Sequence, residues 1–290
     1  MTTRDFPFAA GRELLEVPLN PAPVRQAATV MLLRDGAHGL EVFMLRRVST
    51  MAFAPSMHVF PGGGVDLRDA TDDLPWAGPD VDDWARTMDC PPDEVRALVA
   101  AAAREVFEET GVLLAGDDEG SDPVERLGGA DAAARARQDL VGRELSFAEL
   151  LGGAGLRLRS DLLGYRAHWI TPEIEPRRYD TRFFVAEVPP GQEPDGETTE
   201  ADRAEWVRPQ DVLAAAEAGE ARLMPPTIVC LEQLQAAGSV SRALGERPAI
   251  APVMPVLVDT GAGTVLRAEL PCAPPRRSPP PPSGSGRAAR

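Results

Sequence analysis

Three carboxylates, Glu105, Glu108 and Glu109, have the spacing in this chain that most clearly suggests chemistry. On a helix, positions i, i+3 and i+4 share one face, where like charges repel by about 0.2–0.5 kcal/mol per pair. A fold gains no stability from such a face unless something neutralises it. Hard divalent cations such as Mg²⁺ and Mn²⁺ prefer carboxylate oxygens, so they are the first ligands to consider. The alternative interpretation is an amphipathic helix with a solvated acidic face.

The element that must carry these acids has recognisable ends. Pro91-Pro92-Asp93-Glu94 is typical of a helix start, because proline fits the first turn and acidic side chains are favoured there. Gly111 is typical of a helix end. The sequence therefore predicts a helix from about residue 92 to residue 110. It also predicts a short buried strand over residues 112–114.

The glycine run 62–64 and the nine residues 104–112 together resemble the signature box of the Nudix hydrolase superfamily. Every fixed position of the second half matches. Gly63 and Arg104 are 41 positions apart, however, which is 27 more than the box allows. The intermediate glutamate of the box falls on Asp69, and the sequence leaves open whether this acid keeps that place once an insertion follows it.

A box split in this way resembles one branch, the acyl-CoA diphosphatases of the peroxisomal type and their bacterial relatives. The similarity also includes residues 51–63, 169–172 and 176–184. It implies an α/β (α+β) fold, an α/β/α sandwich around a mixed β-sheet with helical insertions. It further implies cleavage of CoA or acyl-CoA to 3′,5′-ADP and (acyl-)phosphopantetheine. Two alternatives stay open: a Nudix hydrolase of NADH, ADP-ribose or a dinucleoside polyphosphate, and a non-catalytic Nudix ligand sensor.

The resemblance also implies catalytic roles for individual residues. Glu105, Glu108 and Glu109 would hold Mg²⁺ or Mn²⁺, with the carbonyl of Gly63 as a further ligand. The cation would neutralise a substrate diphosphate and lower the pKa of water. Arg104 would pair with a glutamate of the box and fix its rotamer. These expectations make the box helix and the glycine run the two halves of one site.

A more distant acid is expected from a loop, six positions before a strand tryptophan. Counting back from Trp206 gives Glu200, which becomes a candidate catalytic residue and metal ligand. Glu197 is the close competitor. The alternative for both is a solvated loop acid, since acidic side chains are mostly exposed.

Seven residues are predicted to contact substrate: Arg46, Arg47, Gly62, Gly63, Gly64, Arg177 and Arg178. Glycines let the backbone approach a ligand closely. Arginines recognise phosphate through bidentate contacts, and the last pair is the candidate for a 3′-phosphate of CoA. For the four arginines the alternatives are a solvated strand end and structural pairing.

The composition of the chain limits the classes of partner that it can bind. The net charge is −15, and all 30 basic residues are arginine. This acidity argues against nonspecific nucleic-acid binding and against attraction to anionic membranes. The small-molecule substrate must therefore be drawn in by a metal ion and local arginines. Three widely separated cysteines without a C-x-x-C motif argue against structural zinc, and the absence of a signal or apolar span makes the cytoplasm the default location.

Domain organisation is predicted in three parts. Residues 1–23 form a loose arm, residues 24–270 a Nudix hydrolase domain, and residues 271–290 a disordered Pro/Arg-rich tail. The domain carries insertions at about 67–92 and 115–160. The first insertion holds Trp76 and Trp84, which we expect to overhang the site and cover an apolar substrate arm. Further elements are predicted as follows: a hairpin over 24–33 and 40–45; strands over 162–170, 182–188, 205–207, 254–258 and 264–270; helices over 81–88, 124–141, 211–218 and 227–237; and a helix capped by Ser146.

Overall fold

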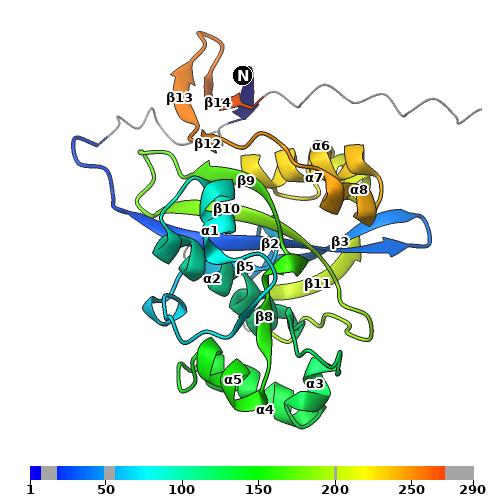
Figure 1. Ribbon diagram of the computed structural model, residues 1–290. Helices are drawn as coiled ribbons and strands as arrows, with labels where there is room; N and C mark the ends of the chain where they lie inside the picture. The colour runs from blue at the N-terminus through cyan, green and yellow to red at the C-terminus, as the bar shows by residue number, and fades with distance from the viewer. Residues whose placement is uncertain (8–17, 49–55, 199–200, 272–290) are drawn as a thin grey trace, which may run out of the picture.

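A mixed β-sheet forms the centre of the computed structural model, which describes residues 1–7, 18–48, 56–198 and 201–271. Its strands lie in the order β11-β3-β2-β10-β9-β12, with β4 paired to β3 and β5 paired to β2 (Figure 1). Strand β10 runs parallel to β2, and β3 forms an antiparallel hairpin with β2. The bounds are β2 Val24–Gly36, β3 Gly39–Arg47, β4 His58–Val59, β5 Gly62–Gly64, β9 Gly164–Ile170, β10 Arg178–Glu187, β11 Ala201–Val207 and β12 Pro252–Val253.

Helices cover both faces of this sheet (Figure 1). On one face lie α1 Val81–Met88 and α2 Pro92–Thr110, and beyond them, around β8, lie α3 Pro123–Arg126, α4 Ala130–Val141 and α5 Phe147–Ala154. On the other face lie α6 Pro209–Glu217, α7 Pro225–Ala237 and α8 Val240–Gly245. This arrangement confirms the predicted α/β/α sandwich. Among the described residues, no helix is both long enough and apolar enough to cross a membrane.

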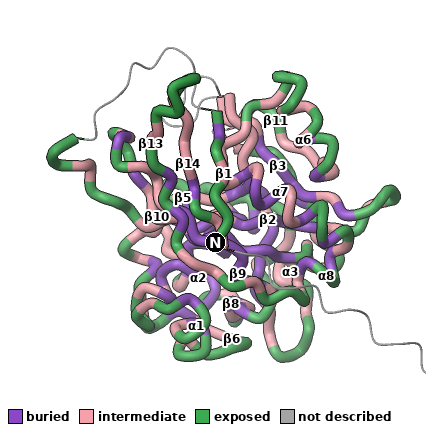
Figure 2. The backbone as a smooth tube through the Cα atoms, turned by 90° about the horizontal axis from the view of Figure 1, so that it is seen from above, coloured by how far each residue is buried: buried purple, intermediate pink, exposed green. Residues whose placement is uncertain are grey.

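Strand β2 explains why the sandwich has two cores. Its side chains alternate between faces, so Val30 and Leu32 pack against α2 while Met31 and Leu33 pack toward α7. All four are fully buried, and Figure 2 shows the burial concentrated at this central strand. A strand that is buried on both faces has a continuous run of apolar residues in its sequence, and β2 has such a run.

The two insertions meet in a small second sheet. Strand β8, Arg157–Arg159, pairs parallel with β6, Trp76–Ala77, and antiparallel with β7, Ala115–Gly116. Trp84 does not overhang the site as expected. It is only 6% exposed and packs edge-on against Phe184 of the central sheet. Trp76 is half-buried and packs against the same core, so the apolar side chains of the first insertion add to that core.

Several other predictions are confirmed and some are wrong. The box helix has the predicted bounds 92–110, and the insertion helix lies at 81–88. The expected helix over 124–141 is two helices, because Gly128 and Gly129 between them both have positive φ. Residues 112–114 are buried but form no strand, since the Gln192 side chain bonds both backbone groups of Leu113 (2.7 and 3.1 Å).

The N-terminal residues are not a loose arm where the structure describes them. Strand β1, Thr2–Pro7, pairs antiparallel with β14, Thr264–Leu270, which also pairs with β13, Val256–Asp259. Phe6 is buried at 3% exposure, and Asp5 forms an ion pair with Arg267 (2.7 Å). The short 3-10 helices are η1 Leu67–Asp69 and η2 Ser160–Leu162. The predicted tail beyond residue 271 and the segment 51–55 lie outside the described residues.

Candidate active site

The last two turns of α2 carry the three glutamates against the edge of the glycine run. The helix starts at Pro92 and ends where Gly111 takes a left-handed conformation (φ +74), as the sequence predicts. Glu105 and Glu108 are largely buried, with 13% and 14% of their side chains exposed. Glu109 is 8% exposed. The acidic face is therefore not a solvated helix surface.

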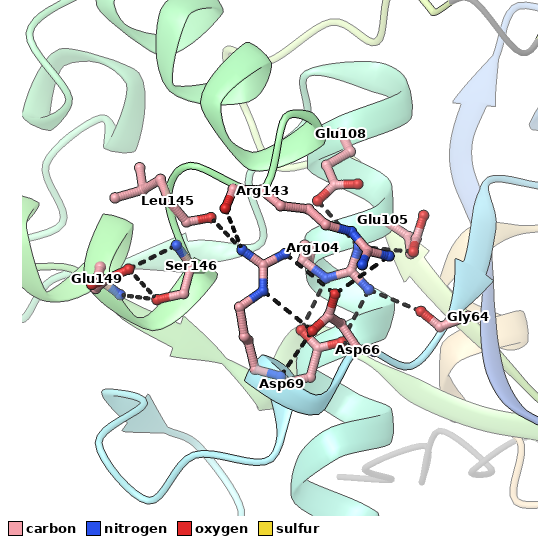
Figure 3. Close-up of polar contacts among 11 residues, drawn as sticks. Gly64, Asp66, Asp69, Arg104, Glu105, Glu108, Arg143, Leu145, Ser146 and Glu149 are labelled. Carbon is pink, nitrogen blue, oxygen red and sulfur yellow. Dashed lines mark hydrogen bonds and ion pairs between the residues drawn. The ribbon is translucent and has the colours of Figure 1, made fainter.

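Arg104 is the centre of the polar network at this face (Figure 3). Its Nη1 donates to Glu105 Oε1 at 2.8 Å and to Glu108 Oε1 at 3.1 Å. Its Nε and Nη2 donate to the two oxygens of Asp69, at 2.9 and 3.0 Å. Nη2 also donates to the carbonyl of Gly64 at 3.0 Å. The pairing predicted for Arg104 with glutamates of the box is present.

Asp69 resolves the question that the insertion raised. Its side chain is 2% exposed and binds Arg104 through a bidentate ion pair. It is held in place by η1, which Asp66 opens with a capping box: Asp66 accepts from the first turn, and Asp69 Oδ2 accepts from the Asp66 N–H at 2.8 Å. The acid at the position of the box's intermediate glutamate therefore stays in the site, and the extra residues loop out after it.

The glycine run contacts the glutamates directly. The N–H of Gly62 donates to Glu109 Oε2 at 2.8 Å. A Cβ atom on Gly63 would lie 2.6 Å from the carboxyl group of Glu105, closer than any side chain tolerates. Gly62 has φ +155 and would place a Cβ 2.4 Å from the carbonyl oxygen of Ala28. The backbone clash requires glycine at 62, and a side chain at 63 would push the Glu105 carboxyl group out of its present position.

Burial raises the pKa of Glu105 to about 7, although the nearby Arg104 opposes the shift. Burial also raises the pKa of Glu108, again against the attraction of Arg104. For Arg104, burial alone would lower the pKa, but the hydrogen bonds to Asp69 and the surrounding carboxylates outweigh it and the pKa is raised. Burial is thus the largest cause of both shifts, and each carboxyl group holds its proton more tightly than a glutamate in water would.

Two of the three glutamates that were expected to bind a metal ion, Glu105 and Glu108, converge at this face. Each directs one oxygen at the same positively charged atom, Arg104 Nη1, and Gly63 lies against the carboxyl group of Glu105 with no side chain between them. Carboxylate oxygens are the ligands that Mg²⁺ and Mn²⁺ prefer. Glu109 points instead at the Gly62 N–H. Accordingly, within the described ranges, no three His, Cys, Asp or Glu side chains are grouped so that they could hold a metal ion.

For the two distant acids, the described residues show no contact between Glu197 and the box glutamates. Glu200 lies outside the described residues. Glu197 is exposed in the loop before β11, and its N–H donates to Asp195 Oδ1 at 3.0 Å. Asp195 in turn pairs with Arg137 of α4 at 2.7 Å, and its N–H donates to the carbonyl of Thr110 at 2.9 Å. The loop that leads to residue 200 is therefore fastened to the end of the box helix.

The four predicted substrate arginines have different surroundings. Arg46 and Arg47 end β3, where Arg46 pairs with His58 of β4 just before the glycine run and forms an ion pair with Asp202 at 2.7 Å. Arg177 is exposed. Arg178 is 8% exposed and donates to backbone carbonyls of Thr171 (3.1 Å) and Ala22 (3.2 Å). Arg178 therefore has the structural pairing role that was the alternative to substrate binding.

Sequence reasoning missed the residues that support the site from outside the box. Arg137 donates from Nε to the Glu108 carbonyl at 2.7 Å and so caps the end of the box helix. Arg68 bonds Asp66 and two carbonyls of the turn after α4. Both arginines come from the insertions, and the backbone carbonyls that they bond are 29 to 77 positions away in the chain. No local signal in the sequence marks such pairs.

Comparisons with known proteins agree with this geometry. No protein-family model matches the chain. The chain is 30% identical over 210 residues to putative nudix hydrolase 7 of Caenorhabditis elegans, covering 72% of this chain and 60% of that protein. It is 28% identical over 246 residues to acyl-coenzyme A diphosphatase NUDT19 of Homo sapiens, covering 71% and 63%. The chain thus spans less than two thirds of the length of the curated relatives it matches.

A solved structure gives a further comparison. The Nudix hydrolase of Alicyclobacillus acidocaldarius superposes with a TM-score of 0.58 at 30% identity, over 78% of this chain and 97% of that one. The α/β/α fold and the carboxylate face that the split box forms together define a protein of the hydrolase class. The chain belongs to the Nudix hydrolase family.

Proposed function

We propose that this protein is a Mg²⁺- or Mn²⁺-dependent diphosphatase that cleaves CoA or acyl-CoA to 3′,5′-ADP and (acyl-)phosphopantetheine. The single observation that carries the hydrolase part is the convergence of Glu105 and Glu108 on one cationic atom beside a glycine run. Burial raises the pKa of both carboxyl groups even with Arg104 bonded to them, so their ionised forms are disfavoured there. Cation binding would make that arrangement favourable.

The residues of the chain divide the work between holding charge and fixing geometry. Arg104 orients Glu105 and Glu108 and is itself fixed by Asp69. The Gly62 N–H orients Glu109. A bound Mg²⁺ or Mn²⁺ would supply positive charge for the diphosphate and lower the pKa of water. Because the carboxyl groups are preorganised by these contacts, little reorganisation is needed when substrate binds.

CoA specificity is supported by the sequence similarity to an enzyme named acyl-coenzyme A diphosphatase. It is also supported by the exposure of Arg177, which leaves one arginine of the 176–178 segment accessible to a phosphate. Arg178 does not contribute to this argument, because its guanidinium bonds backbone carbonyls. Trp84 does not contribute either, because it is a core residue.

A substrate panel tests the proposal. The purified protein is incubated with Mg²⁺ or Mn²⁺ and CoA, acyl-CoA, 3′-dephospho-CoA, NADH, ADP-ribose or a dinucleoside polyphosphate, and products are identified by mass. We expect 3′,5′-ADP and phosphopantetheine from CoA, and none in EDTA. Asp93→Asn, an exposed acid in the first turn of the same helix, is the matched control for box variants and should retain full activity.

The same panel separates the alternatives. Arg177→Ala should lower kcat/KM for CoA about tenfold and leave 3′-dephospho-CoA unchanged, since a charge-assisted contact to the 3′-phosphate is lost. Faster cleavage of NADH or ADP-ribose than of CoA would replace the CoA assignment with a different nucleoside diphosphate substrate. Binding of these compounds without turnover of any would favour the ligand-sensor alternative.

A further inference from the structure

The turn that follows α4 brings an arginine into an unusual backbone conformation next to the carboxylate face. The N–H of Glu144 donates to the carbonyl of Asp139 (2.8 Å) and that of Arg143 to the carbonyl of Leu140 (2.9 Å). These two bonds define a helix ending whose left-handed residue is usually glycine. Here that residue is Arg143, with φ +62, while Gly142 before it is right-handed, with φ −70.

A non-glycine residue with positive φ is disfavoured by contact between its Cβ and the backbone. A glycine directly before it could end the helix without that cost. The positive φ of Arg143 therefore indicates that the side chain at this position has a function.

The turn is fastened to the site rather than free on the surface. Arg68 donates from Nη1 to the carbonyls of Arg143 (3.1 Å) and Leu145 (3.3 Å). The rest of its guanidinium bonds Asp66, at 3.2 Å from both Nε and Nη2. Asp66 also caps η1, the element that holds Asp69 against Arg104. The position of Arg143 is thus fixed relative to the box.

Among the three arginines of this cluster, Arg143 alone has most of its side chain in solvent. The Arg104 donors are taken up by Asp69, Glu105, Glu108 and Gly64. The Arg68 donors are taken up as described above. The Arg143 side chain is 77% exposed and makes one loose ion pair, Nη2 to Asp66 Oδ2 at 3.7 Å. Figure 3 shows it extending from the turn toward Arg104.

We propose that Arg143 binds a phosphate group of the substrate's diphosphate at the rim of the carboxylate face, and that the second insertion exists in part to position it. This inference rests on the proposed function for the class of substrate. A guanidinium offers two parallel donors that match phosphate oxygens. In a chain of net charge −15, a local cation beside the site opposes the repulsion between protein and anionic substrate.

Binding of a non-hydrolysable diphosphate tests the inference without requiring turnover. The Kd of α,β-methylene-ADP in Mg²⁺ is measured by calorimetry for the wild type and for Arg143→Gln, Arg143→Lys and Arg143→Gly. We expect Kd to rise about tenfold for the glutamine and glycine variants, as for a lost charge-assisted contact at an exposed site, and less for lysine. Arg135→Gln, an exposed arginine on the same helix, should bind like the wild type.

Thermal unfolding provides the second measurement. Arg143→Gly should raise Tm by about 2 °C because it relieves the left-handed strain, even though it weakens binding. Asp89→Gly is the matched control: Asp89 also ends a helix with positive φ (51°) and is exposed, but lies away from the box. It should gain stability without any change in Kd.

Unchanged Kd in all three Arg143 variants would overturn the inference, as would a wild type that does not bind the probe. If the wild type hydrolyses the substrate panel and the Arg143 variants bind normally, only the inference fails. If the wild type hydrolyses none of the panel but Arg143 variants still bind the probe more weakly, the inference stands and the proposed function fails.

Discussion

Removing the charge of Glu105 should stabilise the metal-free protein, and the structure sets the size of the effect. Burial raises the pKa of this carboxyl group from 4.5 to about 7. A group with a higher pKa when folded holds its proton more tightly in the folded state. Its favourable contribution is therefore present at low pH and is lost as pH rises from about 4.5 through about 7. The shift corresponds to about 3 kcal/mol at pH values above 7.

The substitution Glu105→Gln keeps an oxygen that can accept from Arg104 Nη1 but cannot ionise. In EDTA at pH 8.5, the variant should unfold with a free energy up to about 3 kcal/mol higher than the wild type. At pH 5.5, where the folded wild type is mostly protonated at this site, the advantage should shrink to about 1 kcal/mol. With Mg²⁺ the order should reverse at high pH, because only the wild type gains stability from binding the ion.

Urea unfolding at the two pH values, with EDTA or Mg²⁺, measures these differences. Asp93→Asn on the same helix is the control and should show neither the pH dependence nor the reversal. A Glu105→Gln variant that is less stable than the wild type in EDTA at pH 8.5 would refute the reasoning. It would mean that Arg104 alone neutralises the face and that no cation is needed there.

Three further results are expected. Glu108→Gln should lower kcat at least about 100-fold while its metal-free stability stays equal or rises, as measured by initial rates and urea unfolding. Asp69→Asn should lower the free energy of unfolding by roughly 3 kcal/mol, because Arg104 stays buried without its bidentate partner; equal stability would contradict the role of this pair. Trp84→Ala should cost about 3–5 kcal/mol of stability without changing KM for CoA, and a selective rise in KM would show that the insertion covers substrate after all.

The parts of the fold that could be predicted depend on signals close together in the chain. The sequence predicts the bounds of the box helix correctly because proline at its start and Gly111 at its end act locally. The hairpin of β2 and β3 followed from a turn between two apolar runs. By contrast, the pairing of β1 with β14 joins the two ends of the described chain, and no periodicity within Thr2–Pro7 indicates a partner so distant.

The same limit applies to the site. The spacing of Glu105 and Glu108 predicts a shared face, and the structure shows it. It does not predict that Glu109 turns to the Gly62 N–H, because that depends on the register of β5 against β2. The spacing also does not predict that the Arg178 guanidinium donates to backbone carbonyls, since an exposed and a buried arginine look alike in sequence.

Binding of Mn²⁺, followed by the loss of the free-ion signal in electron paramagnetic resonance, tests most directly whether the carboxylate face is a cation site. The wild type should bind Mn²⁺ at pH 8, and Mg²⁺ should displace it. The double variant Glu105→Gln, Glu108→Gln should bind at least about tenfold more weakly, while Asp93→Asn binds normally. Equal Mn²⁺ affinity in the wild type and the double variant would contradict the account.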